Sequence, residues 1–141
     1  MTTNAGFDIA TIKPQERIIE MVFPGTEVPV GIRVTLKSLD DEALKATKRA
    51  IRDRATYLEQ RGKGFKAIDL EENANTLIFK AMSGWEWYAP EDGEQATFKG
   101  EIPDFNKRNV DAVLDEVSWF GAQLAKELDD TAAFFRRSKP I

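Results

Sequence analysis

Histidine and cysteine are both missing from this chain of 141 residues. Imidazole is the usual general base near neutral pH and the commonest metal ligand, so its absence excludes every catalytic triad that contains histidine. The lack of cysteine excludes disulfides, thiolate catalysis and thiolate metal sites. Adjacent carboxylates such as Asp40-Asp41 point to different faces of a helix and are better explained as helix-end charges. The sequence therefore predicts a non-enzymatic protein without a cofactor or metal.

Long apolar runs are missing as well. None approaches the about 18 residues that indicate a membrane span. Residues 1–6 have neither the basic start nor the apolar stretch of a signal peptide, so we expect a cytoplasmic protein with no membrane partner. Hydrophobic residues make up 42% of the chain and charged residues 31%, a composition typical of a folded globular protein.

Two short motifs are interpreted as loops. Gly62-Lys63-Gly64 lacks the upstream glycine and the following Ser or Thr of a phosphate-binding loop. Asp92-Gly93-Glu94 lacks the remaining oxygen ligands of a calcium loop and is typical of a turn.

Two segments near the N-terminus have the pattern of a β-hairpin. Residues 17–23 and 28–36 are rich in Ile, Val and Phe, and Pro24-Gly25-Thr26 separates them. Alternation in the second segment places Val30, Ile32, Val34 and Leu36 on one face. Because two strands alone are marginal in water, the hairpin is expected to pack on helices.

Four helices are predicted after the hairpin. The first begins at Ser38, which has Asp41 at capping-box spacing, and ends at Gly62; the second covers residues 69–82. Asn106 is expected to cap the third and Ser118 the fourth. The fourth helix is expected to carry a wide apolar stripe formed by Trp119, Phe120, Leu124, Leu128, Phe134 and Phe135.

The segment between the second and third helices is predicted to be extended from Trp85 onward. Trp87 and Phe98 lie on either side of Asp92-Gly93, which is compatible with a small irregular hairpin. In total, we expect a mainly α member of the α+β class, with an N-terminal β-hairpin packed on about four helices. Residues 1–16 are predicted to form a loose arm, 17–136 a single domain and 137–141 a basic tail.

Charge is distributed unevenly along the chain. Residues 39–66 hold 8 basic and 5 acidic side chains, a net of +3, whereas residues 67–135 hold 5 basic and 15 acidic ones, a net of −10. Four of the basic residues form a band on the first predicted helix, namely Lys45, Lys48, Arg49 and Arg52. A solvated helix face is one interpretation of this band, and a contact surface is the other. The acidic remainder repels phosphates, so nucleic acid is not expected as the main partner.

The order of features in the second half resembles the small tail assembly chaperones of long-tailed (siphovirus-type) bacteriophages, which are encoded ahead of the tape measure gene. The resemblance covers about residues 77–136. Its elements are Gly84-Trp85, Asp92-Gly93, Phe98, Asn109-Val110 with Leu114, Gln123, Asp130 and Phe134-Phe135. An acidic insert at residues 99–104, and Ser118 where a proline is often found, depart from the family pattern.

The resemblance implies a role in virion assembly without enzymatic activity. Proteins of this family coat the tape measure protein in the host bacterial cytoplasm, help to recruit tail tube subunits and are absent from the mature virion. Self-association, and a longer form made by ribosomal frameshifting, come into consideration as further partners. A structural head-tail or minor tail protein of the particle is the alternative, and a regulatory DNA-binding module is a more distant one.

Aromatic side chains are the other candidates for partner contact. We expect Trp85, Trp87, Phe134 and Phe135 to lie on or near the client-binding face, because aromatic residues bury a large area at low entropy cost. The competing interpretation assigns them to the hydrophobic core, where aromatics of a domain this size are commonly found, and for Phe134 that interpretation is favoured.

Overall fold

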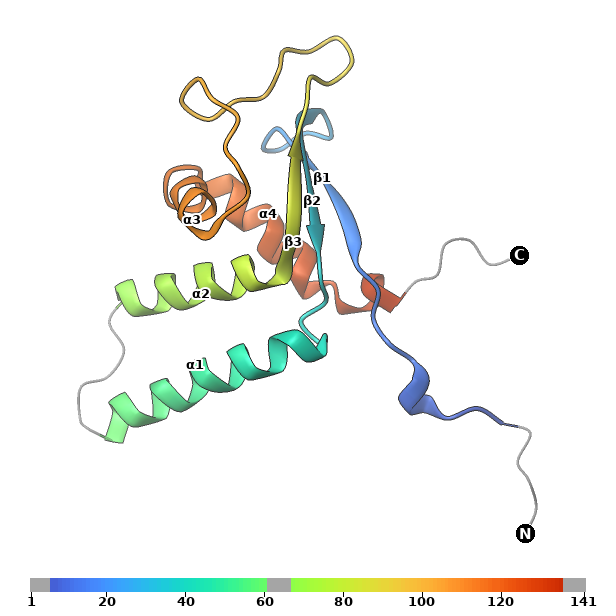
Figure 1. Cartoon of the computed structure of the whole chain (residues 1–141), viewed down its shortest axis with the longest axis vertical. Coiled ribbons are helices and arrows are strands. Elements are labelled where there is room, and N and C mark those ends of the chain that lie inside the picture. Colours follow the sequence, from blue (N-terminus) through green and yellow to red (C-terminus); the bar gives the residue numbers. More distant parts are fainter. Residues whose placement is uncertain (1–5, 61–66, 136–141) are drawn as a thin grey trace.

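Three antiparallel strands form one sheet in the computed structural model, which describes residues 6–60 and 67–135 (Figure 1). The strands are β1 (Arg17–Val22), β2 (Pro29–Leu36) and β3 (Met82–Trp87), in the spatial order β1-β2-β3. The predicted N-terminal hairpin is confirmed, with Ile19 opposite Val34. The third strand corrects the prediction: Trp85 lies opposite Val34 and Trp87 opposite Ile32, so this segment extends the hairpin.

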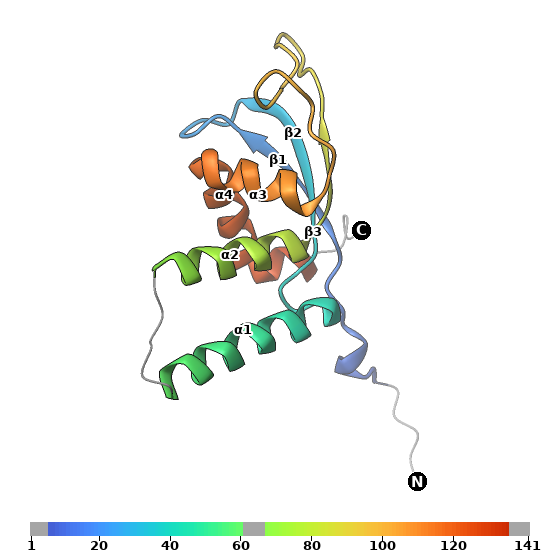
Figure 2. The ribbon, with the colours of Figure 1, turned by 60° about the vertical axis from the view of Figure 1, so that its left-hand side comes forward.

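The two faces of the sheet differ in the way that alternation in β2 predicts. Ile32, Val34 and Leu36 are buried against the helices, whereas Arg33 is exposed on the other face. Figure 2 shows the helices gathered on one side of the sheet. The sheet is therefore a half-covered layer, and the structure as a whole belongs to the α+β class.

In the described part of the chain, four α-helices follow the hairpin: α1 (Glu42–Gln60), α2 (Ala67–Ala81), α3 (Lys107–Glu116) and α4 (Ser118–Asp129). Short 3-10 turns, η1 (Ile9–Thr11) and η2 (Thr131–Phe135), lie near the two ends of the described chain. Helix α1 packs on α2, α2 on α3 and α4, and α4 on β1. One hydrophobic core joins these elements, and its fully buried side chains include Met21, Val34, Leu36, Leu44, Val110, Phe120, Leu124 and Phe134.

Helix boundaries agree with the sequence only in part. Asn106 caps α3 as predicted, because its side-chain oxygen accepts from the backbone N–H of Asn109 at 2.8 Å. Ser38 instead closes the preceding turn through the N–H of Asp40, and Asp41, which accepts from Ala43 N–H, stands directly before the first helical residue.

Two further boundary predictions were wrong. The N-cap position of α4 is Val117 rather than Ser118, and the apolar side chain of Val117 cannot accept a capping hydrogen bond. The last helix does not continue to Phe135 but ends at Asp129, and a separate 3-10 turn follows. The predicted helix end at Gly62 and the basic tail at 137–141 lie outside the described residues.

The connection between α2 and β3 has no loop. Ala81 is the last residue of the helix and Met82 the first of the strand, and both are buried. The carbonyl of Ala81 accepts a hydrogen bond from the N–H of Lys37 at 2.7 Å, just beyond the end of β2. The junction is thus fixed by the burial of Ala81 and Met82 and by the backbone hydrogen bond from Lys37.

Residues 6–16 form an arm that carries η1 and exposes most of its side chains, including Phe7, Ile9 and Ile12. The N–H of Gln15 donates to the carbonyl of Phe134 at 2.7 Å, which ties the end of the arm to η2.

Candidate partner-binding surfaces

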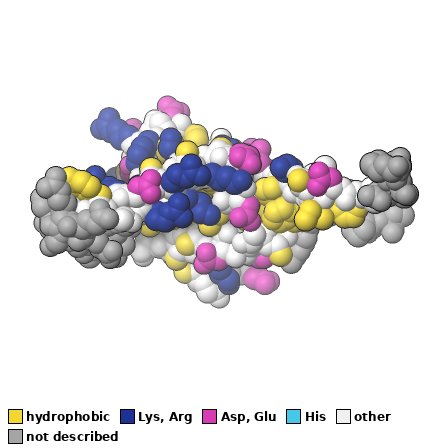
Figure 3. All heavy atoms as spheres, turned by 90° about the horizontal axis from the view of Figure 1, so that it is seen from below, with side chains coloured by type: hydrophobic (Ala, Val, Ile, Leu, Met, Phe, Trp, Pro, Cys, Tyr) yellow, Lys and Arg dark blue, Asp and Glu magenta, His cyan; other side chains and the backbone are white. Residues whose placement is uncertain are grey.

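The basic band lies on one exposed face of α1. Its four side chains, those of Lys45, Lys48, Arg49 and Arg52, surround a shallow hollow of about 180 Å³. Figure 3 shows dark-blue side chains gathered on this side of the molecule. The structure therefore brings the four predicted residues together on one surface.

Neutralisation of the band is incomplete. Lys45 pairs with Glu42 at 3.0 Å, and Lys48 donates weakly to the carbonyl of Leu39 at 3.5 Å. Within the described part of the chain, no carboxylate pairs with Arg49 or Arg52. Exposed ion pairs contribute at most about 1 kcal/mol, so the band is not needed to hold the fold together. Its charge is available to an acidic partner.

Trp85 joins three parts of the fold. Its indole N–H donates to the carbonyl of Pro103 at 3.1 Å. Its ring meets Trp87, Phe105 and Phe120 edge-on, with centroids 5.3, 5.7 and 6.3 Å apart. Edge-to-face pairs of this kind stabilise beyond the area they bury. The half-buried Trp85 side chain thus fixes β3, the following loop and α4 to one another.

Phe134 and Phe135 have different surroundings. Phe134 is only 1% exposed and belongs to the core, and the guanidinium of Arg17 lies over its ring, 5.1 Å from the centroid. Arg17 also pairs with Glu127 at 3.0 Å. The interpretation of Phe134 as a core residue therefore describes its position in this structure.

Phe135 is half-buried and contributes to a hollow of about 470 Å³ beside the basic band. Lys45 lines the same hollow from α1, and Ile12 lines it from the N-terminal arm. Of the predicted contact residues, Phe135 and Lys45 thus share one depression of the surface.

Trp87 lines a much larger groove of about 870 Å³ at the end of the sheet opposite α1. One wall is the loop of residues 88–98, which follows β3 at the top of Figure 1. The others come from β2, the β1–β2 turn and the junction of α3 with α4. Val117 and Trp119 line the groove from that junction.

The loop that forms this wall is held in place at both ends. At its start, the N–H of Tyr88 donates to the carbonyl of Gly31 at 2.7 Å. At its end, Phe98 pairs with Glu101 in an isolated bridge, and Lys99 forms an ion pair with Glu116 of α3 at 2.6 Å. The predicted turn at Asp92-Gly93 is present, with the N–H of Gly93 donating to Pro90.

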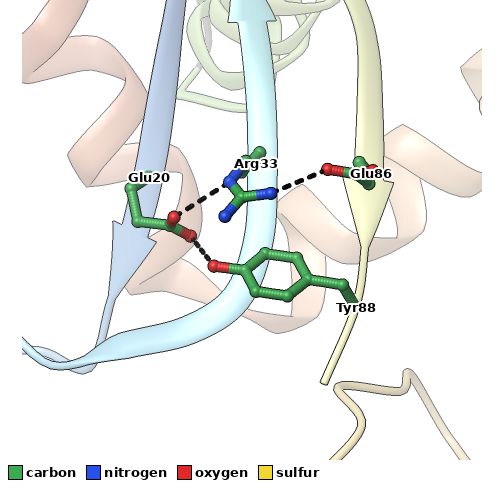
Figure 4. A network of polar contacts seen from close by, with 4 residues as sticks. All are labelled: Glu20, Arg33, Glu86 and Tyr88. Atoms are coloured by element: carbon green, nitrogen blue, oxygen red, sulfur yellow. Dashed lines mark hydrogen bonds and ion pairs between the residues drawn. The ribbon is translucent and has the colours of Figure 1, made fainter. Parts of the chain in front are cut away.

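A charged network crosses the exposed face of the sheet beside the groove (Figure 4). Arg33 pairs with Glu20 of β1 and with Glu86 of β3, both at 3.1 Å. The Tyr88 hydroxyl donates to Glu20 at 2.5 Å, and Arg33 lies over the Tyr88 ring, 4.1 Å from its centroid.

Two pKa values in this network depart from their ordinary values. Burial raises the pKa of Tyr88, and the hydrogen bond to Glu20 raises it further. Hydrogen bonds to Glu86 and Glu20 raise the pKa of Arg33, which therefore stays charged. The network links the three strands to one another and fixes Tyr88, the first residue of the 88–98 loop, to β1.

Sequence reasoning missed most of the groove. The sequence pattern links Phe98 to Trp87 only through a small hairpin, and it assigns Trp119 to a helix stripe without linking it to either residue. The available signal was the run of acids Glu91, Asp92 and Glu94 between two aromatic segments. That run was interpreted only as a turn.

Across residues 6–60 and 67–135, no three acidic side chains gather as they would around a metal ion. No helix in the same ranges has the length and apolar character needed to cross a membrane. Comparison of the chain with protein-family models, with curated proteins and with solved structures gives no match.

Proposed function

We propose that this protein is a tail assembly chaperone of a long-tailed bacteriophage. It binds the tape measure protein in the host cytoplasm, keeps that long, partly apolar client soluble and helps to recruit tail tube subunits. It performs no chemistry and leaves before the particle is complete. The observation that carries the proposal is the ordered set of features between Gly84 and Phe135, which resembles the pattern of the family.

Several of these features lie at contacts between secondary-structure elements, which supports the proposal. Trp85 ties β3 to the loop at Pro103. Asn109 donates to the carbonyl of Asp104 at 2.9 Å and fixes the entry into α3. Gln123 bonds to the backbone of Val22. A resemblance made of residues that determine the packing is more informative about the fold than one made of surface residues.

Two separate surfaces of opposite charge also suit a protein with two partners. The basic band lies on α1, and the groove with its acidic loop lies at the far end of the sheet. Charge complementarity speeds encounter and selects partners more than it adds affinity. One surface is thus available to the tape measure protein while the other meets a tube subunit.

Co-expression with the tape measure protein tests the proposal. We expect the client to remain in the supernatant only when this chain is present. Mass spectrometry of purified particles separates a chaperone from the alternative, a structural head-tail or minor tail protein. A stoichiometric amount in mature particles, or a client equally soluble without this chain, would overturn the proposal.

Single alanine substitutions test the aromatic contact residues in the same assay. The substituted positions are Trp85, Trp87, Phe134 and Phe135. Circular dichroism of each variant separates loss of binding from loss of the fold. If client solubility is lost only in variants that have themselves unfolded, the assignment of these side chains to the interface is wrong.

A further inference from the structure

The groove beside the 88–98 loop has an apolar interior. Trp87, Phe98, Val117 and Trp119 line it while only half-buried, so part of their surface is free to be covered. Its volume of about 870 Å³ lies in the range of built binding sites. Aromatic side chains that are rigid and partly exposed are favoured anchors for a partner.

Apolar surface continues beyond the mouth of the groove. Phe23 and Val28, on the β1–β2 turn, line it and are 50% and 56% exposed. An occupant confined to the interior would leave these two side chains in water. A chain that passes through the groove and over the turn would cover them as well. The shape therefore fits a polypeptide segment better than a compact small molecule.

The rim of the groove is acidic. Glu91, Asp92 and Glu94 are exposed on the loop, and none of them forms an ion pair with a described residue. The cation that lines the groove, Arg33, is already engaged by Glu20 and Glu86. The unpaired charge at the mouth is thus negative and favours a partner with Lys or Arg beside its apolar residues.

A hydrogen-bond donor without an acceptor in the wall of the groove, the indole N–H of Trp87, favours an occupant that offers a free backbone carbonyl. The indole Nε1 of Trp87 is enclosed and has no hydrogen-bond acceptor among the described residues, unlike that of Trp85. A buried donor without an acceptor is destabilising. If the Trp87 ring turns toward the groove, a carbonyl of an extended segment would supply the missing acceptor, whereas the carbonyls within a helix are already engaged.

The groove is also preformed. Backbone bonding of Tyr88 to Gly31 and the ion pair of Lys99 with Glu116 hold the loop at both ends. A site that is already ordered loses less conformational entropy when it binds.

We propose that this groove binds an extended, apolar polypeptide segment flanked by Lys or Arg. The inference rests on the proposed function in that it takes the partner to be a polypeptide client, and it names the surface and the chemistry of that contact.

Two synthetic peptides with an identical apolar core provide the probe, one flanked by lysines and the other by glutamates. Because Trp87 and Trp119 line the groove, intrinsic tryptophan fluorescence of the full chain reports binding. We expect the lysine-flanked peptide to bind and the glutamate-flanked peptide to bind at least about tenfold more weakly. Equal affinity for the two peptides would overturn the inference.

Charge reversal locates the binding. In the double variant Glu91→Lys/Glu94→Lys, affinity for the lysine-flanked peptide should fall by about tenfold or more. The matched control is Asp53→Lys/Asp129→Lys, which reverses two exposed carboxylates outside the groove. Circular dichroism and urea midpoints confirm that both variants fold. An affinity unchanged in the rim variant, or lowered equally in the control, contradicts the assignment.

Polar substitution on the turn provides a second test that does not depend on charge. In Phe23→Ser/Val28→Ser, both side chains are exposed and only apolar surface is removed, so folding is retained while peptide binding weakens. Two other occupants give different results. A dimer that is lost in Phe7→Ser/Ile9→Ser would place the arm of a second copy in the groove, and saturation by an apolar small molecule without peptide binding would indicate a ligand pocket. Either result overturns the inference.

The full-length tape measure protein separates the inference from the function on which it rests. If the wild-type chain keeps the client soluble and Glu91→Lys/Glu94→Lys does so equally well, the groove is not the contact, although the chaperone function stands. If the wild-type chain fails with the client but its groove still selects the lysine-flanked peptide, the proposed function is wrong and the peptide site remains.

Discussion

Gln123 of α4 and Val22 of β1 exchange two hydrogen bonds through the side-chain amide of the glutamine. The N–H of Val22 donates to Gln123 Oε1 at 3.1 Å, and Gln123 Nε2 donates to the carbonyl of Val22 at 2.7 Å. Strand β1 is an edge of the sheet, where backbone groups lack a neighbouring strand. The amide of Gln123 takes the place of that strand at one residue and fastens α4 to the sheet edge.

Substitution Gln123→Ala should lower the free energy of unfolding by about 1–3 kcal/mol, because it leaves both backbone groups of a half-buried residue without partners. Gln123→Glu keeps the acceptor and loses the donor, so a loss is expected there as well. Urea denaturation measures both, with the exposed Lys126→Gln on the same helix as control. A stability equal to that of the control would mean that water replaces the amide at no cost.

Gly31 is the position where the 88–98 loop crosses β2. A Cβ added there would lie 2.4 Å from the carbonyl oxygen of Tyr88 and 2.9 Å from Cδ of Pro90, and the residue has φ +106°. Gly31→Ala should therefore destabilise the protein by about 1–3 kcal/mol and displace the loop.

The matched control for Gly31 is Gly84→Ala in the adjacent strand, where a Cβ meets no described atom within 4 Å. We expect the control to leave the melting temperature unchanged or to raise it. Thermal melting compares the two, and tryptophan fluorescence reports displacement of the loop through Trp87. Equal effects at the two positions would show that the close approach at Gly31 is not maintained in solution.

Tyr88 is expected to make the free energy of unfolding depend on pH in the alkaline range. Its pKa lies above the ordinary 10.0 because burial and the hydrogen bond to Glu20 both favour the neutral phenol. Below pH 10 the folded and unfolded chains both keep this proton, and the stabilisation is complete. As the pH rises from 10 through the folded-state pKa, the unfolded chain releases its proton first, and the stabilisation is lost.

Tyr88→Phe should remove this part of the pH dependence. The variant begins about 1 kcal/mol less stable at neutral pH, because the hydrogen bond to Glu20 is gone, and its difference from wild type should shrink above pH 10. Urea midpoints at a series of pH values measure it. The difference curve between wild type and variant isolates Tyr88, because the two proteins are identical at every other position. A difference that stays constant above pH 10 contradicts the raised pKa.

Phe134 and Phe135 are neighbours with very different burial, so they make a natural pair. Phe134→Ala empties a fully enclosed site beneath Arg17 and should cost about 3–5 kcal/mol. Phe135→Ala removes a half-buried ring and should cost about 1–2 kcal/mol. Chemical denaturation ranks the two. The reverse order would place Phe134 on the surface in solution.

The basic band should be dispensable for folding. Lys45, Lys48, Arg49 and Arg52 are all exposed. Changing all four to Glu is therefore expected to alter the free energy of unfolding by less than about 1 kcal/mol for each exposed ion pair that is lost. Binding to one of the two proposed partners should be lost while the fold remains. Pull-down with purified tape measure and tube proteins tests this.

The control for the band keeps its charge and exchanges the residue types, as in Lys45→Arg, Lys48→Arg, Arg49→Lys and Arg52→Lys. Retained binding in this control, together with loss in the reversed variant, identifies charge as the determinant. If both partners still bind the reversed variant, the band is only a solvated face.

Local patterns were enough to predict the hairpin and part of the helix layout. Alternation from Val30 to Leu36 and the break at Pro24-Gly25 are properties of short segments, and so is the cap at Asn106. The pairing of Trp85 with Val34 was missed because it joins residues far apart in the chain, and strand pairing is decided by packing as much as by propensity.

The candidate surfaces divide along the same line. The basic band follows from helical spacing within one element, so its four residues could be grouped from the sequence. The groove is assembled from β2, the 88–98 loop and the α3–α4 junction, and no local pattern connects these segments. Phe134 is another example. Its spacing assigns it to the apolar stripe of a helix, but only the tertiary structure places it beneath Arg17.

The absence of a loop between α2 and β3 has a mechanical consequence. Ala81 passes directly into Met82, so no hinge separates the helix from the strand. At its other end the strand carries Trp87, a wall of the groove. Because α2 continues into β3 without a loop, a shift of α2 relative to the sheet, with α1 packed against it, would act directly on the strand that carries Trp87.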